Sequence, residues 1–209
     1  PEAPVSPNRL LIGGGSVGIN AARMAMGMGA DVTLVDRSID RLKELEMIFG
    51  GRLKTVFSTR ESIEHFALRA DLVVGAVLVP GAAAPKLISR ELVARMRPGS
   101  VLVDVAIDQG GCFETSRPTT HAEPTFVVDG VIHYCVANMP GAVARTSTQA
   151  LTNATLPYVL RLANGGLEAL RGDAGLRAGL NVHNGELTHE GVAAALGGSF
   201  VDPQLALRG

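Results

Sequence analysis

RLLIGGGSVG, residues 9–18, joins a short apolar run to the first turn of a helical pattern. Its glycines Gly13, Gly15 and Gly18 have the spacing G-x-G-x-x-G directly after a strand-like run, as in βαβ units that bind dinucleotides. Gly13 would permit a tight turn, Gly15 the approach of a pyrophosphate to the backbone, and Gly18 close packing of the helix on the sheet. Free N–H groups at the start of the helix suit a phosphate anion. The stretch therefore predicts a dinucleotide site after the first strand.

Strand-like and helical patterns alternate along the first half of the chain. Continuous Val/Leu-rich runs are typical of parallel strands covered by helices on both faces, so the alternation predicts an α/β fold with a Rossmann-type, doubly wound, mostly parallel sheet. Two later apolar runs, 125–129 and 131–136, flank the turn dipeptide Asp129-Gly130 and predict a strand pair that closes the sheet. The expected strands are 9–12, 31–36, 52–58, 71–77 and 100–106, and the expected helices are 17–28, 39–49, 61–69 and 90–96.

The last third of the chain has a different pattern. A long and strongly apolar helix is expected over 146–163, with a kink at Pro157. Too little chain follows it to cover such a surface, and the chain begins with Pro1 rather than Met, so we expect a piece of a longer polypeptide. We divide it into a nucleotide-binding domain, 1–144, and a segment of a second, largely absent domain, 145–209.

Composition narrows the class of protein. The 209 residues are 46% hydrophobic and 19% charged, with 25 glycines, as expected for an α/β enzyme. A formal net charge of −1 without basic clusters gives nucleic acid no binding surface, and no apolar run approaches 18 residues, so no membrane segment is expected. Cys112 and Cys135 are too few for a disulfide framework and are expected to be small buried apolar residues in a reducing cytosol.

A carboxylate at the end of the second strand indicates which dinucleotide binds. Asp36 follows the glycine loop at the spacing where it can accept hydrogen bonds from the adenosine ribose, which favours NAD. A 2′-phosphate about 4 Å away would be repelled by about 4 kcal/mol at an intermediate dielectric. Arg37 and Arg41 could supply a counter-charge, so NADP stays an alternative.

The loop after the fifth strand carries a second carboxylate. Asp108 precedes the flexible pair Gly110-Gly111 at the carboxyl end of a strand, where α/β folds bind ligands. It can present a negative charge beside the nicotinamide, or it can cap a turn, which is the more common role of an aspartate in a loop. The residues alone leave both roles open.

Five stretches together resemble the carboxyl-terminal part of the bacterial L-alanine dehydrogenase family. The resemblance covers essentially the whole chain, and the last of the five stretches separates this family from the related transhydrogenases better than the glycine loop does. The stretches are GGGSVG (13–18), GAVLVPGA (75–82), DVAIDQGGC (104–112), YCVANMP (134–140) and TSTQALTNAT (146–155).

The resemblance implies reversible, NAD-dependent oxidative deamination of L-alanine to pyruvate and ammonia. It assigns Asp108 a catalytic role, Ser58 an adenine-side contact, and Asn138 and Met139 contacts beside the nicotinamide. No metal is implied. The cofactor-binding residues carried over are Gly13, Gly15, Ser16, Val17, Gly18, Asp36, Arg41, Ser58, Val77, Leu78, Val105, Ile107, Asp108, Asn138 and Met139.

The family's remaining active-site residues lie outside this sequence. Its substrate-binding arginine and lysine and its catalytic histidine come from an amino-terminal domain, so the isolated chain is expected to be inactive. None of the five histidines sits in a matching motif, and all are expected to be surface or structural residues. The resemblance also implies a cytoplasmic homo-oligomer, a hexamer.

Two other functions remain as alternatives. The chain could be the NAD-binding part of a proton-translocating transhydrogenase, which would go with membrane segments elsewhere. It could also be a module that binds NAD without catalysis, although such a module would need a polar exterior and would have no use for Asp108.

Overall fold

The computed structural model describes residues 6–79 and 84–208, so the end of the stretch GAVLVPGA falls outside it. The described residues divide into two compact units, 6–79 with 84–139 and 140–208. The first unit contains the sheet and the predicted nucleotide site. The second consists of helices and a short hairpin.

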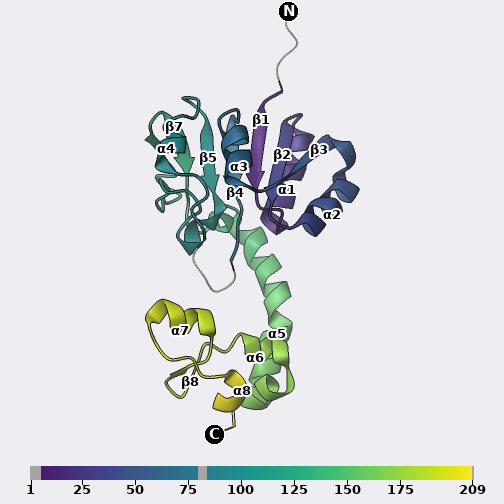
Figure 1. The fold of residues 1–209 in the computed structure, drawn as a ribbon. Coiled ribbons are helices and arrows are strands. Elements are labelled where there is room, and N and C mark those ends of the chain that lie inside the picture. Colours follow the sequence, from purple (N-terminus) through teal and green to yellow (C-terminus); the bar gives the residue numbers. More distant parts are fainter. Residues whose placement is uncertain (1–5, 80–83, 209) are drawn as a thin grey trace, which may run out of the picture. The chain divides into compact units, whose positions relative to one another are not determined.

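A seven-stranded sheet with the order β3-β2-β1-β4-β5-β7-β6 forms the first unit (Figure 1). All neighbours in it pair in parallel except β6 and β7, which form the expected antiparallel hairpin. Its turn residues Asp129 and Gly130 have φ of 50° and 79°, as a two-residue hairpin turn requires. The predicted α/β fold with a mostly parallel sheet is confirmed. The strands are β1 (Asn8–Ile12), β2 (Asp31–Asp36), β3 (Leu53–Phe57), β4 (Leu72–Gly75), β5 (Val101–Asp104), β6 (Thr125–Val128) and β7 (Val131–Tyr134).

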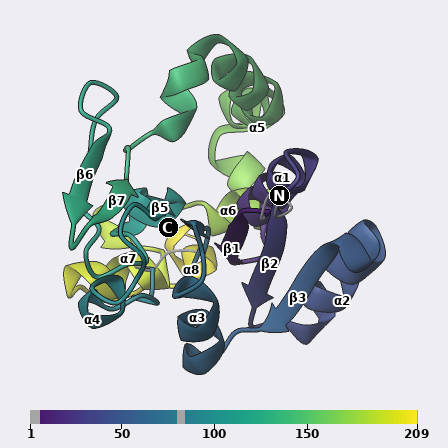
Figure 2. The same ribbon diagram turned by 90° about the horizontal axis from the view of Figure 1, so that it is seen from above.

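Helices cover both faces of this sheet. Side chains alternate along a strand, and Leu10 and Leu11 of β1 are both 1% exposed, because each meets a helix layer on its own side. Leu11 packs in a cluster with Leu45 of α2, and Leu10 in another with Ile63 of α3. Figure 2 shows α1 and α3 on opposite sides of the sheet. The helices are α1 (Ser16–Gly27), α2 (Ile39–Phe49), α3 (Arg60–Ala67) and α4 (Arg90–Val93).

Short 3₁₀ segments join several elements, and local capping sets where helices begin. Ser89 caps α4 by accepting a hydrogen bond from the Leu92 N–H at 3.3 Å. The loop after β5 is not irregular but forms a 3₁₀ turn ended by a left-handed Gly110. The 3₁₀ segments are η1 (Gly50–Arg52), η2 (Val105–Gln109) and η3 (Met139–Val143).

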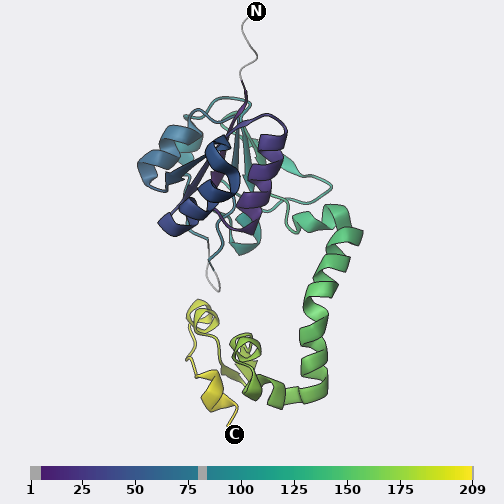
Figure 3. The ribbon, with the colours of Figure 1, turned by 90° about the vertical axis from the view of Figure 1, so that its right-hand side faces the viewer.

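The second unit is built on α5, the 29-residue helix drawn in green in Figure 3. A kink was predicted at Pro157, but the interruption of the helical dihedral angles lies at Gly166, whose φ is 52° and ψ −133°. Glycine adopts such angles without the penalty that a Cβ imposes. The remaining elements are α6 (Ala174–Ala178), β8 (Val182–His183), β9 (Glu186–Leu187), α7 (Glu190–Leu196) and α8 (Pro203–Ala206), after α5 (Ala144–Gly172).

Within the described ranges, no helix has both the length and the hydropathy needed to cross a bilayer.

Candidate functional site

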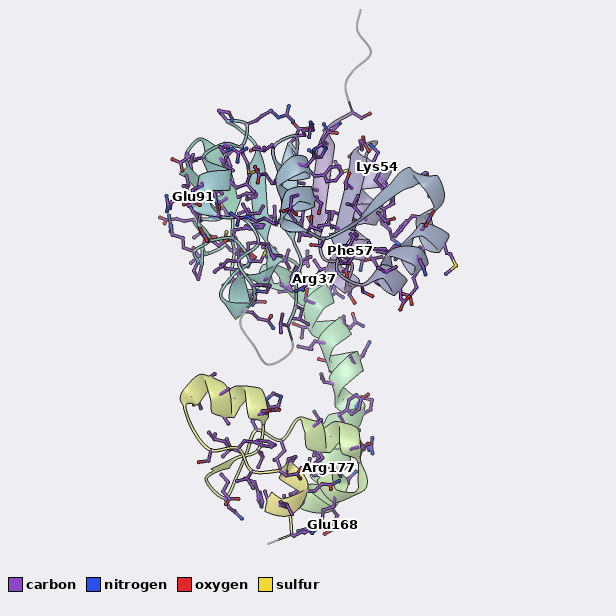
Figure 4. All side chains as sticks on the ribbon, viewed as in Figure 1. Arg37, Lys54, Phe57, Glu91, Glu168 and Arg177 are labelled. Carbon is purple, nitrogen blue, oxygen red and sulfur yellow. The ribbon has the colours of Figure 1, made fainter. Side chains whose placement is uncertain are left out.

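The carboxyl ends of β1, β2, β3 and β4 meet at a pocket of about 700 Å³. This volume lies in the range of cofactor sites. Figure 4 shows Arg37 and Phe57 at this end of the first unit and Lys54 toward the other end of β3. The pocket is lined by Ile12, Gly13, Gly14, Gly15, Ser16, Val35, Asp36, Arg37, Ser38, Arg41, Ser58, Ala76, Val77, Leu78, Pro85 and Leu87.

Two of the three predicted glycines are required by backbone contacts. A Cβ on Gly18 would lie 1.9 Å from the carbonyl oxygen of Gly13, so α1 can approach β1 only with glycine there. A Cβ on Gly13 would lie 2.6 Å from the carbonyl oxygen of Ala76, and Gly13 has a φ of 105°. Gly18 is buried and does not line the pocket, so it shapes the site by packing.

Gly15 differs from the other two, because nothing lies within 4 Å of the position its Cβ would take. It is the N-cap of α1, where no side chain accepts the free N–H groups and no acidic residue stands in the first turn. Those N–H groups and the positive end of the helix dipole face open space beside Ser16. This arrangement fits the pyrophosphate of a dinucleotide.

The Asp36 carboxylate is fixed by the loop it faces. Its Oδ2 accepts a hydrogen bond from the Gly14 N–H at 2.6 Å, and its Oδ1 accepts one from the Ser38 N–H at 2.8 Å. Each oxygen keeps a second lone pair, so the carboxylate can still accept hydrogen bonds from ribose hydroxyls. Gly14, which the sequence analysis did not single out, is therefore part of the site.

Arg41 is held away from the role of a phosphate counter-charge. Its Nε donates to the Gly14 carbonyl at 2.8 Å, and its Nη1 lies 2.7 Å from the Glu44 carboxylate. Arg37 is exposed and lines the same pocket. Of the two arginines considered for NADP, Arg41 is thus already engaged by a carboxylate.

The other predicted contacts divide into two groups. Eight of the predicted residues line the pocket at the ends of β1 to β4, and Val105 lines a shallow apolar groove together with Ser16 and Val17. Asp108, Asn138 and Met139 line neither. The eight are Gly13, Gly15, Ser16, Asp36, Arg41, Ser58, Val77 and Leu78.

In the second group, Ile107 and Asp108 lie on the 3₁₀ turn that follows β5, and Asn138 and Met139 follow β7. Asp108 is exposed on η2, whereas the neighbouring Ile107 side chain is only 4% exposed, so Ile107 can offer a ligand little beyond its backbone. Asn138 is exposed with a φ of 56°, and its carbonyl lies 3.0 Å from Nε2 of His121. Met139 is partly exposed.

Both cysteines are buried, as expected for residues that pack like small apolar side chains, although polar groups lie nearby. Cys112 is 0% exposed, and burial together with the nearby Asp104 carboxylate raises the pKa of its thiol. Burial also raises the pKa of Cys135. Both thiols stay protonated and are poor nucleophiles, which confirms the expected buried role.

His133 is a structural histidine, as expected. Its Nε2 lies 2.7 Å from Thr115 Oγ1 and its Nδ1 lies 3.0 Å from the Val131 carbonyl oxygen. Burial lowers its pKa, since a charged imidazole would lose its hydration there.

Comparison with known proteins agrees with this geometry. Residues 3–190 match the family model described as alanine dehydrogenase/PNT, C-terminal domain. The chain is 66% identical over 200 residues to the alanine dehydrogenase of Halomonas elongata, covering 95% of this chain and 54% of that protein. It is 55% identical to that of Bacillus subtilis, with 95% and 53% covered.

Solved structures give the same result. An L-alanine dehydrogenase superposes with a TM-score of 0.82 at 52% identity, over 91% of this chain and 53% of that one. The transhydrogenase of Sinorhizobium meliloti follows with a TM-score of 0.70 at 23% identity, a likeness of fold alone. The chain spans about half the length of the curated relatives it matches.

Proposed function

Since this chain belongs to the alanine dehydrogenase/PNT C-terminal domain family and carries its NAD-binding domain, we propose that the protein catalyses NAD-dependent oxidative deamination of L-alanine to pyruvate and ammonia. The observation that carries the proposal is the open glycine loop facing Asp36, in a chain 66% identical to a named alanine dehydrogenase. The residues that bind the substrate carboxylate are proposed to come from the amino-terminal half that these relatives contain.

The pocket residues receive defined roles in this proposal. NAD supplies a hydride acceptor when it is bound. The free N–H groups after Gly15 hold its pyrophosphate, and Asp36 accepts hydrogen bonds from the adenosine ribose. Ser58 lies on the adenine side. The other cofactor contacts proposed are Gly13, Ser16, Val17, Gly18, Arg41, Val77, Leu78, Val105, Ile107, Asp108, Asn138 and Met139.

Asp108 is the catalytic residue that this chain contributes. Its exposed carboxylate is free to approach the reacting part of the substrate, where positive charge develops as the hydride leaves. Water must be kept out for that charge to be stabilised, and the substrate half of the active site would provide the cover.

A calorimetric titration with NADH and NADPH tests the cofactor proposal. We expect tighter binding of NADH, and we expect Asp36→Ala to weaken it by about 10- to 100-fold, equivalent to about 1.4–2.7 kcal/mol. Unchanged affinity in Asp36→Ala would remove Asp36 from the ribose site.

An assay of alanine-dependent NAD reduction by the complete gene product tests the reaction. NADH formation that requires L-alanine, with a large loss of kcat in Asp108→Asn and little change in NADH affinity, is the expected result. NADH binding without any reaction of alanine would instead favour a nucleotide-binding module.

We also propose a domain division into 1–144 and 145–209, and a cytoplasmic homo-oligomer, hexameric as in the resembling family. Support comes from the compact units, which separate near residue 139, and from α5, where Leu151, Tyr158 and Val159 are each more than half exposed. Light scattering of the complete gene product measures the number of subunits, and a monomer would contradict the proposal.

A further inference from the structure

Residues 84–87, which follow β4 in the chain, lie beside the loop that carries Asp108. The Ala84 N–H donates to the Gln109 carbonyl at 3.1 Å, and the Leu87 N–H donates to the Cys112 carbonyl at 2.7 Å. These backbone hydrogen bonds skip Gly110 and Gly111, whose carbonyls need another donor.

Lys86 provides that donor. Its ammonium group lies 2.6 Å from the Gly110 carbonyl oxygen, 2.8 Å from that of Gly111 and 3.3 Å from that of Phe113. An ammonium group has three N–H donors, so these contacts use all of them, and hydrogen bonds from a charged donor are stronger than neutral ones. Every carbonyl from 109 to 113 therefore accepts from the segment 84–87.

Asp104 binds the amide groups of the same loop. The carboxylate is fully buried and accepts from the N–H groups of Ala106 at 3.1 Å, Cys112 at 2.9 Å and Phe113 at 3.3 Å. The Ser116 hydroxyl also donates to it at 2.5 Å. The loop is thus held by a cation on its carbonyls and an anion on its amides.

We propose that Lys86 is a positioning residue that fixes the catalytic Asp108, an inference that rests on the proposed function. Gly110 and Gly111 have φ of 86° and 74° and no side chains, so they resist no rearrangement by themselves. Among the described hydrogen bonds none is made by the Asp108 carboxylate, so its place depends on how the turn is held. Losing Lys86 leaves the Gly110 and Gly111 carbonyls to water, whereas that of Phe113 keeps the Ser116 N–H, and it lets Asp108 move.

The test compares Lys86→Met with Lys86→Arg in the complete gene product. Methionine keeps the length of the side chain and removes the donors, whereas arginine keeps a cation. We expect Lys86→Met to lower kcat for alanine oxidation by about 10- to 100-fold with less than about a twofold change in NADH affinity, and Lys86→Arg to restore most of the rate. Lys54→Met is the control, because Lys54 pairs with Asp31 at 2.6 Å at the other end of the sheet. The kcat of the Lys54→Met protein should equal that of the wild type.

A double mutant distinguishes positioning from an independent effect. If Lys86 acts through Asp108, adding Lys86→Met to Asp108→Asn should lower kcat by less than about twofold further. Losses that multiply, a wild-type kcat in Lys86→Met, or a loss of NADH affinity as large as the loss of kcat would each overturn the inference.

Hydrogen exchange of the amides in 105–113 gives a readout that does not need activity. We expect faster exchange in Lys86→Met, and wild-type exchange in Lys86→Arg and Lys54→Met. A wild-type protein that does not oxidise alanine overturns the proposed function, whereas unchanged exchange in Lys86→Met overturns the role of Lys86.

Discussion

Two parts of the site are built in opposite ways. The glycine loop after β1 depends on the absence of side chains, because backbone segments come into close contact at Gly13 and Gly18, where a Cβ would not fit. The loop after β5 depends on two charged side chains, since Asp104 accepts hydrogen bonds from its amides and Lys86 donates to its carbonyls. A methyl group introduced at the glycine loop should therefore destabilise the first part. The second part should lose its structure when a supporting charge is removed or when a side chain is added at its glycines.

The largest effect is expected at the glycine loop. Gly18→Ala places a Cβ 1.9 Å from a backbone oxygen, which only a shift of helix α1 can relieve. Overpacking commonly costs about 1–3 kcal/mol, and we expect the upper end or more, measured as the free energy of unfolding in urea. Gly15→Ala is the matched control: it meets nothing within 4 Å and should keep its stability while losing NADH affinity. Equal stability losses in both variants would contradict the comparison.

The next effect concerns the pair that follows Asp108. Gly111→Ala would put a Cβ 2.8 Å from Asp104 Oδ2 and 2.9 Å from Ser116 Cβ, at a φ of 74°. The left-handed conformation alone costs about 1–2 kcal/mol for a residue with a Cβ, and the contacts add to it, so we expect a loss of about 2–3 kcal/mol. Gly110→Ala has a similar φ of 86° but open space, and should cost only about 1 kcal/mol. Thermal or urea unfolding of both variants measures the difference, and a smaller loss in Gly111→Ala would refute it.

The first part of the site was predictable because its determinants are local. Glycines at fixed spacing after an apolar run, and Asp36 at the end of the next strand, are visible in a single βαβ unit. The same holds for the sheet, whose hairpin turn is recognisable from Asp129-Gly130. The role of Gly14 was not predicted, because it contributes only backbone groups: its N–H donates to Asp36 and its carbonyl accepts from Arg41.

For the second part, the sequence predicted Asp108 but not the contacts that hold its loop. Lys86 donates hydrogen bonds to carbonyls 24 to 27 positions away in the sequence, and no local residue pattern predicts such contacts. Asp104 was expected within the strand 100–106, whereas it is the last residue of β5 and its buried carboxylate binds the amides of the following loop. The sequence predicted a kink in α5 at Pro157, because proline is the stronger helix breaker in general, but the helical dihedral angles are interrupted at Gly166.

Acid should destabilise the protein through His133, which lies beside the second part of the site. His133 contacts Thr115 at the end of the loop, and burial lowers its pKa, with the Arg90 charge acting in the same direction and the Val131 carbonyl and Asp104 opposing it. The unfolded state therefore binds a proton more tightly, so the full stability is present above pH 6.5, the ordinary pKa, and falls as the pH drops below it. We therefore expect the free energy of unfolding in urea to fall from pH 7 to pH 5.

His133→Gln tests this assignment by its slope rather than its absolute stability. The decline of the unfolding free energy with acid should flatten in this variant, whereas His65→Gln, at an exposed position, should keep the wild-type slope. The same slope in all three proteins would mean that another group titrates.

The smallest effect should appear at Arg41, where one charge acts within the glycine-loop part of the site. Glu44 engages Nη1 of Arg41 at 2.7 Å on a partly exposed surface. Glu44→Gln removes a negative charge near the ribose site and releases the guanidinium, so NADPH should gain about two- to fivefold relative to NADH, as expected for an exposed pair worth under about 1 kcal/mol. Glu46→Gln, an exposed carboxylate on the same helix, should leave the ratio unchanged. Titration of both variants with NADH and NADPH measures the ratio of the two affinities. An unchanged ratio in Glu44→Gln would mean that Asp36 alone sets the preference for NADH, and that the Arg41–Glu44 pair has no part in it.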